Sequence, residues 1–491
     1  MANTNDIRPG KKIVAIDFSA LVPEGKFLRS VLTLAGGTTS AQLLTVLAAP
    51  LLTRLYTPEE FGLLAIYASI LALIAVVATF RYEIAIPLPD NDQFAANIVG
   101  LSFLILLAIT FLSAIAVAGL GDSLAMKLNV PSFSNYIWLL PVGVFLGGIY
   151  NIFNYWAVRR KQYSSIANTV ISQSVATLGI QLLGSMFGAI ALIAGVIVGQ
   201  GIASFRLAKQ ALKQPQFRKL SVTEMKRASV RYKKFPIFSS AAGLINSVGY
   251  QSVPLIIAYL VGPAAAGVYA LASRVVTMPG ALIGAAIGNV FLSDAPEQHR
   301  LHRLGTLVES VHEKLSILAA PPAIFLMFFG PEVFAFVFGE NWRMAGVFAQ
   351  WLSLPLYAAF ITSPLSMIFA IVEQQKLGLY MQAVLMLARL LPLIFGTLSG
   401  GLEFGIACFA VGSFFGYMAY ALVAFGEAQV AISRIIYRMA IDWLLALLCI
   451  GPLALVFQLN ESVTVLTLVA CMSALLLYFY LRRMNKSVEQ Q

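Results

Sequence analysis

The sequence predicts an all-α protein that crosses a membrane about 14 times. Of its 491 residues, 59% are hydrophobic and 11% are charged, whereas roughly a quarter of an average globular chain is charged. Lipid must therefore be the solvent for most of the surface. Because a bilayer offers the backbone no hydrogen-bonding partners, the spans are helices or a closed barrel. The apolar runs are continuous, which excludes the alternating strands of a barrel.

A helix needs about 20 apolar residues to cross the hydrocarbon core, and fourteen segments meet this length. The separation between the fifth and sixth is the shortest, with only Gly184 to Gly188 marking a turn. The predicted spans are 29–52, 61–80, 95–118, 135–157, 163–187, 189–209, 236–260, 264–291, 315–338, 344–372, 376–398, 402–426, 440–458 and 462–481.

The basic residues predict the orientation. An even number of spans places both termini on one side, and 28 of the 33 Lys and Arg fall on that side, which is then the cytoplasmic side. Outer loops hold only Arg54, Lys127 and Arg343, and two arginines fall within spans. The net charge of +11 therefore reflects topology and not nucleic-acid binding. The polar start of the chain predicts no cleavable signal peptide.

The spans and loops predict five parts: a cytoplasmic segment at 1–28, a first lobe at 29–211, a basic linker at 212–235, a second lobe at 236–426, and two further spans with a tail at 427–491. Ser221 and Glu224 have the spacing of a capping box, which predicts a helix start in the linker. The linker is either a solvated loop or a contact for anionic lipid headgroups. Apolar residues at helical spacing in 293–314 predict a second helix along the membrane surface.

Two segments of the chain resemble each other at an offset of 205 residues. The run LLTRLYTPEEFGLLA begins at Leu51 and the run IIAYLVGPAAAGVYA begins at Ile256. Pro58 matches Pro263 and Gly62 matches Gly267, in both cases at the outer loop between two spans. The matching spans are six apart, which predicts parallel repeats with substrate bound between two halves.

Three segments resemble a known family. They are Leu52–Tyr67 (LTRLYTPEEFGLLAIY), Arg81–Leu101 (RYEIAIPLPDNDQFAANIVGL) and Gly267–Pro279 (GVYALASRVVTMP). They resemble Wzx-type oligosaccharide flippases of the multidrug/oligosaccharidyl-lipid/polysaccharide exporter superfamily, over about residues 28–480. The resemblance implies two pseudo-symmetric six-helix lobes around a central cavity, plus two C-terminal helices. It also implies that an undecaprenyl-diphosphate-linked oligosaccharide is flipped across a bacterial inner membrane for surface polysaccharide synthesis.

The two arginines within spans are the main candidates for a binding site. A charge at the centre of a spanning helix costs about 2.5–3.5 kcal/mol, so Arg274 and Arg389 need a compensating partner. The seventh and eighth spans contain no Asp or Glu. Arg274 therefore either pairs with an acid on another helix or faces a wet cavity, where its guanidinium suits a diphosphate. Arg389 either binds substrate, pairs with Glu373 or reaches the interface.

Further polar residues fall on or beside the spans. The seventh span carries Ser239, Gly243, Asn246, Ser247 and Tyr250 at helical spacing, with Gln251 beside them. Such residues either contact sugar or let helices pack. Arg54 and Arg81 lie at span ends within the family-like segments, and we include both as candidate substrate contacts. Arg81 has Glu83 as a local partner for an ion pair.

The sequence also bears on two rival functions. A cation-coupled drug exporter of the same superfamily needs acids within the membrane, and the first, seventh and eighth spans hold none. A polysaccharide polymerase or ligase needs a long outer loop, and the longest here is about 119–134. No nucleotide-binding loop is present. We expect no cofactor and no metal. We expect the cysteines to be buried and not joined in disulfides. Coupling of transport to a proton or sodium gradient stays open. Polymerase and export machinery are further expected partners.

Overall fold

The protein is described by a computed structural model covering residues 26–363, 365, 368–459, 469–470, 472–477 and 480. The described residues form helices joined by short turns. The long helices are α1 (Lys26–Leu55), α2 (Pro58–Val77), α3 (Asp92–Lys127), α5 (Leu140–Arg159), α6 (Tyr163–Leu183), α7 (Ala189–Leu212), α9 (Ser240–Leu260), α10 (Pro263–Arg300), α11 (Leu304–Phe338), α12 (Arg343–Thr362), α14 (Gln375–Glu427) and α15 (Ile432–Gln458).

Shorter helical segments occupy the connections. They are η2 (Tyr82–Ala85), η3 (Pro131–Phe133), α4 (Ser134–Ile137), η4 (Ser185–Phe187), η5 (Pro215–Arg218), α8 (Val222–Arg231), η6 (Phe235–Ser239), η7 (Glu340–Trp342) and α13 (Ile368–Ile371). The turn η4 separates α6 from α7, which confirms the break predicted between the fifth and sixth spans.

The predicted spans as far as residue 458 fall on helices, although 135–157 is divided between α4 and α5 and 344–372 between α12 and α13. Within the described ranges, nine helices are long and apolar enough to cross a membrane, or up to ten if α4 and α5, bent by 51°, form one span. Helix α14 contains two predicted spans: the chain turns at Gly401, whose φ is +82°, and Gly412 then packs against the Ala388 carbonyl. The predicted segment before residue 26 and most of the fourteenth span, with Cys471, lie outside the described residues.

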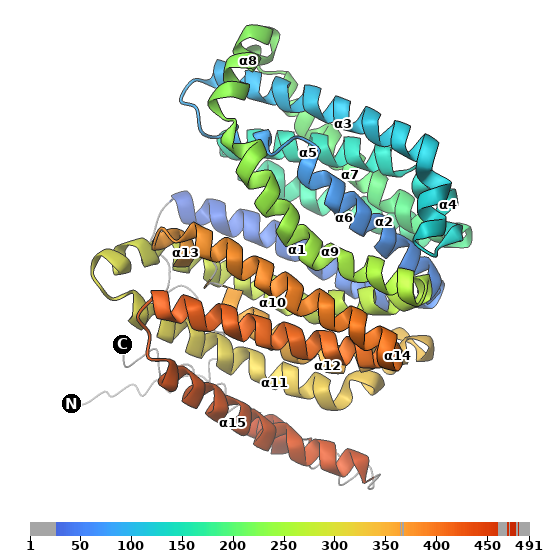
Figure 1. Cartoon of the computed structure of the whole chain (residues 1–491), viewed down its shortest axis with the longest axis vertical. Coiled ribbons are helices and arrows are strands. Elements are labelled where there is room, and N and C mark those ends of the chain that lie inside the picture. Colours follow the sequence, from blue (N-terminus) through green and yellow to red (C-terminus); the bar gives the residue numbers. More distant parts are fainter. Residues whose placement is uncertain are drawn as a thin grey trace, which may run out of the picture.

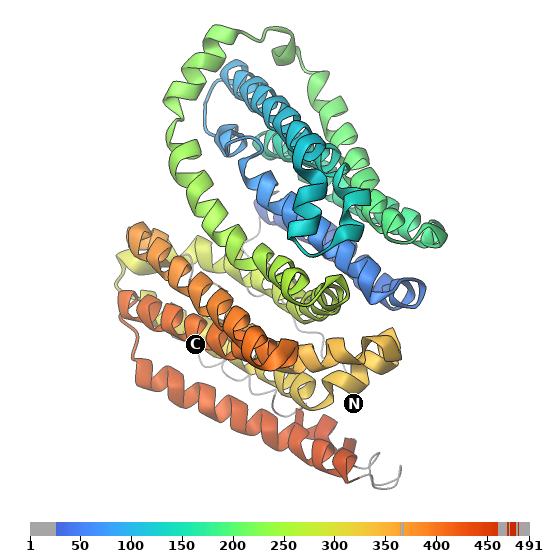
Figure 2. The same ribbon diagram turned by 45° about the vertical axis from the view of Figure 1, so that its right-hand side comes forward.

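The helices are grouped into two lobes. In Figure 1, α3, α5, α6 and α7 lie together in one half of the molecule, and α10, α11, α12 and α14 lie in the other. Helix α15 is outermost beside the second group, and α8 caps the far tip of the first. Figure 2 shows α9 and α10 along the boundary between the two halves. The fold is therefore an all-α membrane fold with two pseudo-symmetric helical lobes.

Turn positions reproduce the internal repeat. Helix α1 ends at Leu55 and α9 ends at Leu260, and the next helices begin at Pro58 and Pro263. Both pairs differ by the predicted offset of 205 residues. Proline is suited to the first turn of a helix, because its missing N–H would have no partner there. A capping box that was not predicted precedes α2, where Thr57 and Glu60 each bond the other's backbone amide.

We call the end of the bundle that holds the turns at 55–58 and 260–263 the outer end, and the opposite end the inner end, after the predicted topology. The two lobes contact each other at the outer end. Trp342 Nε1 donates to the Thr53 carbonyl at 2.9 Å, and the Trp342 ring packs edge-on against Phe61 at 5.0 Å between centroids. Asn129 Nδ2 donates to the Tyr259 carbonyl at 3.3 Å. The outer turns of both lobes are thus joined.

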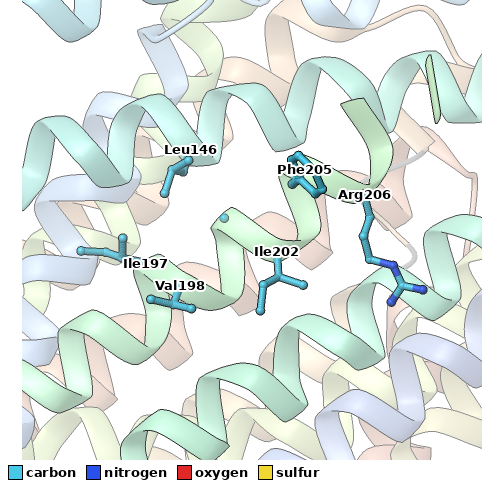
Figure 3. Close-up of a pocket in the computed structure, with 7 residues that line it drawn as sticks. Leu146, Ile197, Val198, Ile202, Phe205 and Arg206 are labelled. Carbon is cyan, nitrogen blue, oxygen red and sulfur yellow. The ribbon is translucent and has the colours of Figure 1, made fainter. Parts of the chain in front are cut away.

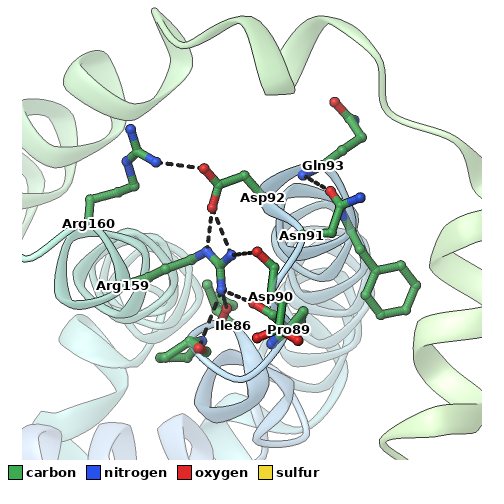
Figure 4. Close-up of polar contacts among 10 residues, drawn as sticks. Ile86, Pro89, Asp90, Asn91, Asp92, Gln93, Arg159 and Arg160 are labelled. Carbon is green, nitrogen blue, oxygen red and sulfur yellow. Dashed lines mark hydrogen bonds and ion pairs between the residues drawn. The ribbon is translucent and has the colours of Figure 1, made fainter.

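An arginine organises the inner end of the first lobe (Figure 4). Arg159, at the last turn of α5, donates to the Asp92 carboxylate at 2.7 Å and to the carbonyls of Pro89 and Asp90. Arg160 binds the other Asp92 oxygen at 2.6 Å. A guanidinium fork can hold a carboxylate and several carbonyls at once. The loop between α2 and α3 is thereby fastened to α5.

The linker packs on the first lobe. Helix α8 begins at Val222, as predicted, but the Ser221 side chain forms no cap hydrogen bond. The backbone N–H of Ser221 instead donates to Asn97 Oδ1 on α3 at 2.7 Å, while the Glu224 carboxylate pairs with Arg227. The predicted capping box is therefore wrong, because a tertiary partner satisfies the helix start. The basic residues Lys226, Arg227, Arg231, Lys233 and Lys234 remain exposed.

The predicted surface helix at 293–314 is also wrong. These residues belong to the inner turns of α10 and α11. Leu304 and Val308 are buried in a core with Phe425 of α14 and Ile435 of α15. The apolar face is real, but it packs against protein instead of the membrane surface.

Candidate functional site

The α9–α10 hairpin carries the predicted polar residues at mid-depth. Tyr250 lies ten residues before the end of α9, and Arg274 lies eleven residues after the start of α10. With a rise of 1.5 Å per residue, both lie about 15 Å from the outer turn. Asn246 is one turn inward of Tyr250 on the same face of α9. The hairpin therefore brings Arg274, Tyr250 and Asn246 to one level of the bundle.

These three side chains are exposed in the structure, Tyr250 by 52%. The opposite face of α9 is covered, because Val253 and Ile257 are each 1% exposed. Gly249 packs against Met386 of α14, and Gly243 packs against Val76 of α2 and Arg81. Helix α9 thus contacts both lobes and leaves its polar face uncovered between them.

The Arg274 guanidinium has no partner among the side chains that the structure describes. Among the described residues it takes part in none of the ion pairs or side-chain hydrogen bonds. The predicted spans 236–260 and 264–291 hold no acid, and the acids described at the inner end of α10 and on the other helices form no ion pair with Arg274. A guanidinium without a partner at this depth provides up to five N–H donors for an anion.

Arg389 has partners that the sequence did not reveal. It is 4% exposed and lies between two tyrosine rings, 4.3 Å from the Tyr250 centroid and 4.7 Å from the Tyr417 centroid. Its Nη2 donates to Tyr250 Oη at 3.3 Å, and the two tyrosine hydroxyls are 2.9 Å apart. The alternative of a pair with Glu373 is not found among the described ion pairs. Cation–π contacts of this kind contribute about 0.5–2 kcal/mol each.

The remaining candidates lie elsewhere. Gln251 is partly buried beside Tyr250. Arg81 lies against Gly243, seven residues and about 10 Å inward of Tyr250. Arg54 is exposed in the last turn of α1 at the outer end. Arg389 therefore contacts α9 through Tyr250, next to Gln251, and Asn246 and Arg274 lie at a similar depth of the α9–α10 hairpin. Arg54 and Arg81 lie toward opposite ends.

Glu83, the acid near Arg81 at the inner end, bonds to Thr79 and not to Arg81. Glu83 is 3% exposed and accepts a hydrogen bond from the Thr79 hydroxyl. Arg81 is absent from the ion pairs of the described residues, although its charge acts on Glu83. Burial raises the pKa of the Glu83 carboxyl, and the Thr79 hydrogen bond opposes this rise. The local Arg81–Glu83 pair is therefore not formed.

Two apolar grooves lie apart from this polar group. One, of about 400 Å³, lies between α5 and α7, where Leu146, Ile202 and Phe205 line it and Arg206 lies at one end (Figure 3). Arg206 donates to Ser172 Oγ at 2.7 Å. The other, of about 470 Å³, lies between α12, α14 and α15. Their linings are almost entirely apolar, so neither offers the set of polar groups that a sugar needs.

The sequence did not predict that the rings of Tyr250 and Tyr417 lie on either side of Arg389. Tyr250 was visible as part of the polar stripe, but its contact with α14 joins residues 139 positions apart. Tyr417 lies in an apolar run with no local signal. The only available signal was the presence of Arg389 itself, because a charge in a span requires a compensating environment.

Comparisons with known proteins agree with this architecture. A family model described as polysaccharide biosynthesis protein matches residues 51–346. The succinoglycan biosynthesis transport protein ExoT of Rhizobium meliloti (strain 1021) is 24% identical over 314 residues, 63% of this chain and 61% of the relative. The match thus spans less than two thirds of that protein's length.

Solved structures share the fold. The lipid II flippase MurJ in an inward closed conformation has a TM-score of 0.69 at 14% identity, covering 96% of this chain and 100% of that chain. A multidrug resistance MATE family transporter of the MOP superfamily in an inward-facing conformation has a TM-score of 0.64 at 16% identity, covering 82% and 94%. These likenesses establish a common helical architecture.

Proposed function

The chain belongs to the family of polysaccharide biosynthesis proteins, and from this premise we propose that it flips undecaprenyl-diphosphate-linked oligosaccharide units across a bacterial inner membrane. The units move from the cytoplasmic to the periplasmic leaflet. The observation that carries this proposal is the exposed Arg274 at mid-depth of the bundle, which forms no ion pair with the described residues. A positive charge at this depth favours an anionic substrate over a neutral or cationic one.

The cost of Arg274 supports an anionic substrate. A charge at this depth costs about 2.5–3.5 kcal/mol. A diphosphate offers oxygens that match the guanidinium fork, and charge-assisted hydrogen bonds of this type are about twice as strong as neutral ones. Substrate binding then supplies the compensation that the described part of the protein does not.

The exposed face of α9 supports a sugar next to that diphosphate. Asn246 provides amide donors and an acceptor, and Tyr250 provides a hydroxyl and a ring face. Arg389 lies behind Tyr250 and holds its ring. In this arrangement Arg274 binds charge, Asn246 and Tyr250 contact the saccharide, and Arg389 positions Tyr250.

The contacts at the outer end support a direction of loading. Trp342, Asn129 and the two proline turns join the lobes at that end. Substrate then enters from the inner leaflet, and its polyprenyl tail stays in lipid while the sugars move between the lobes. Release requires these outer contacts to separate, which is alternating access by two lobes.

The same proposal includes the surroundings of the protein. Both termini lie in the cytoplasm, and the exposed basic residues of the linker contact anionic lipid headgroups. The polymerase and export machinery of the same pathway receive the flipped unit.

The test is polymer export by cells that carry only an Arg274→Ala variant. We expect export to fall at least about tenfold, as expected for the loss of a charge-assisted contact of about 1.4 kcal/mol or more, and lipid-linked units to accumulate on the inner leaflet. Arg274→Lys should keep part of the activity, because it retains the charge without the fork.

Arg300→Ala is the matched control, because Arg300 is an exposed arginine at the inner end of the same helix. It should export normally. Normal export by Arg274→Ala at normal abundance would exclude the anion site. Loss of the Arg274→Ala protein from the membrane would instead support a structural role.

A further inference from the structure

The groove between α5 and α7 runs along α7 from mid-depth toward the inner end of the first lobe. Six residues form its α7 side: Ile197, Val198, Gly201, Ile202, Phe205 and Arg206. Their spacing places them on one face of the helix. At a rise of 1.5 Å per residue they extend over about 14 Å, and Arg206 lies about 9 Å from the end of α7 at Leu212. The groove is therefore elongated along the helix axis.

The two helices that form the groove are in direct contact. The buried Ser204 of α7 donates its hydroxyl to the Leu146 carbonyl of α5 at 2.7 Å. A Cβ atom added to Gly201 would lie 3.5 Å from Leu146 Cδ1. Ile202 and Phe205 nevertheless stay exposed, Phe205 by 66%. The groove is therefore a surface depression with apolar walls.

Three basic residues follow one another at the inner end of this groove. Arg206, Lys209 and Lys213 are exposed, and their spacing of three and four residues places them on one side of α7. Lys209 Nζ lies 5.7 Å from the centroid of the Phe205 ring, beside the groove. Arg206 Nη1 donates to Ser172 Oγ of α6 at 2.7 Å, which orients the guanidinium and leaves its other N–H groups for a ligand. Figure 3 shows Arg206 at the end of the apolar lining.

The helices around the groove hold no acid that could neutralise these cations. The chain has no Asp or Glu between Asp122 and Glu224, a stretch that contains all of α5, α6 and α7. Arg206, Lys209 and Lys213 also take part in none of the ion pairs among the described residues. The groove therefore ends in a positive charge that is complementary to an anionic group.

We propose that this groove binds an anionic phospholipid of the inner leaflet, with an acyl chain along Ile202 and Phe205 and the phosphate at Arg206 and Lys209. Long basic side chains near a helix end carry their charge to the headgroup level while their stems lie along apolar surface. A guanidinium forms charge-assisted hydrogen bonds with phosphate oxygens, and the groove removes part of the chain from competing contacts. A zwitterionic lipid has the same chains without the net negative charge, so the cations favour the anionic lipid.

A bound lipid differs from general attraction to the membrane surface. General attraction needs only basic residues, such as those of the linker. The proposed site needs the apolar groove and Arg206 together, because one holds the chain and the other holds the phosphate. Filling the groove without changing any charge should therefore weaken binding, just as removing the charge should. The site lies apart from Arg274 and does not depend on the proposed flipping function.

The first experiment uses a phosphatidylglycerol probe that carries a photoreactive group in one acyl chain. Purified full-length protein in phosphatidylcholine vesicles with a trace of this probe is illuminated, and the crosslinked peptides are identified by mass spectrometry. We expect adducts within residues 197–206 of α7. An excess of unlabelled phosphatidylglycerol should remove these adducts, whereas the same excess of phosphatidylcholine should not.

Two variants test the two parts of the site separately. Arg206→Gln should lower the adduct yield about fivefold, as expected for one basic residue near an anionic headgroup. Gly201→Leu keeps every charge and fills the space beside Leu146, and it should lower the yield to a similar extent. Gly201→Ala adds only a Cβ atom in ordinary contact, and Arg300→Gln removes an exposed arginine at the inner end of α10. Both are matched controls and should label like the wild type.

The second measurement is the melting temperature of the purified protein with added lipid. A ligand that binds only the folded state stabilises it, so phosphatidylglycerol should raise the melting temperature more than phosphatidylcholine does. Arg206→Gln and Gly201→Leu should lose this difference, and the two controls should keep it.

Three results would overturn the site. They are equal labelling of 197–206 by a phosphatidylcholine probe with the same photoreactive chain, adducts that persist in both Arg206→Gln and Gly201→Leu, and a melting temperature that responds equally to the two lipids. Displacement of the probe by undecaprenyl diphosphate at a lower concentration than by phosphatidylglycerol would overturn the assignment to a phospholipid. Neither measurement requires transport, so both are independent of the Arg274 test.

Discussion

Gly62 of α2 lies directly against the Pro263 carbonyl at the first turn of α10. A Cβ atom added to Gly62 would be 1.8 Å from that oxygen. Gly267 makes the equivalent contact, because a Cβ there would be 1.9 Å from the Pro58 carbonyl. The four residues are two pairs related by the offset of 205. The two lobes thus meet through a self-complementary contact, as subunits do across a two-fold axis.

This contact predicts that Gly62→Ala and Gly267→Ala each prevent full closure of the outer end. The added methyl group cannot fit, so the helices must separate at a cost of about 1–3 kcal/mol. A cysteine replacing the buried Ala65, one turn further along α2, should then react faster with an impermeant thiol reagent from outside. Polymer export should fall in both variants.

Because the two contacts are equivalent, Gly62→Ala and Gly267→Ala should open the outer end to a similar extent. Gly119→Ala is the control, since a Cβ there meets nothing within 4 Å. If only one of the two variants opened the outer end, the contact would not be functionally symmetric.

Arg389 predicts an energetic coupling across the second lobe. Arg389→Ala should lower the thermal stability of the purified protein and leave the tyrosine rings without their central cation. The loss should be about 1–4 kcal/mol, because two cation–π contacts and a hydrogen bond disappear. Arg389→Lys should recover part of the loss.

A double-mutant cycle with Tyr250→Phe separates the hydrogen bond from the ring contact. Tyr250→Phe keeps the ring face 4.3 Å from the guanidinium and removes only the hydroxyl. A zero coupling energy between residues 250 and 389 would show that the bond between the Tyr250 hydroxyl and the Arg389 guanidinium contributes nothing to stability.

Local rules explain why much of the fold could be predicted. Apolar length gave the spans, and Pro58 and Pro263 marked helix starts because proline fits the first turn. The lack of acids in the spans 236–260 and 264–291 left two alternatives for Arg274, an acid on another helix or a wet cavity, and Arg274 pairs with none of the described acids. These features depend on residues close together in the chain.

Tertiary contacts explain the errors. Ser221 and Glu224 match a capping box, but Asn97 on α3 takes the Ser221 amide. The apolar face around Leu304 and Val308 has the same pattern whether lipid or protein covers it, and α14 covers it here. The tyrosines around Arg389 come from two separate helices, so no spacing rule could pair them.

Glu83 predicts a pH-dependent stability at the inner end. Its pKa is raised by burial, so the folded state favours the neutral acid more than the unfolded state does. The resulting stability is present below the ordinary pKa of about 4.3 and is lost as the pH rises through the folded value. Glu83→Gln stays neutral and should therefore be more stable than wild type at pH 8.

The measurement is the melting temperature of both proteins from about pH 5 to about pH 8. The difference should grow with pH, because only the wild type must ionise a buried group. Glu403→Gln, at an exposed position, should show no such trend. A difference that stayed constant over this range would mean that Glu83 does not titrate on folding.

The outer contact finally predicts a reversible lock. Glu59 follows Pro58 and Ala264 follows Pro263, so cysteines at these two positions lie on the facing first turns of α2 and α10. A disulfide needs Cα atoms within about 4.4–6.8 Å, which the packing of Gly62 against Pro263 brings within reach. Oxidation of the Glu59→Cys, Ala264→Cys variant should stop export by holding the outer end closed, and reduction should restore it.

The background must lack the native thiols Cys408, Cys449 and Cys471, and either cysteine alone should be harmless. Substrate binding should survive the lock, because the inner end stays free to open. Failure to crosslink would mean that the two turns do not face each other in the membrane. In the fully crosslinked protein the sugars cannot leave between α2 and α10. Normal export by that protein would therefore exclude lobe separation at the outer end as a step in transport.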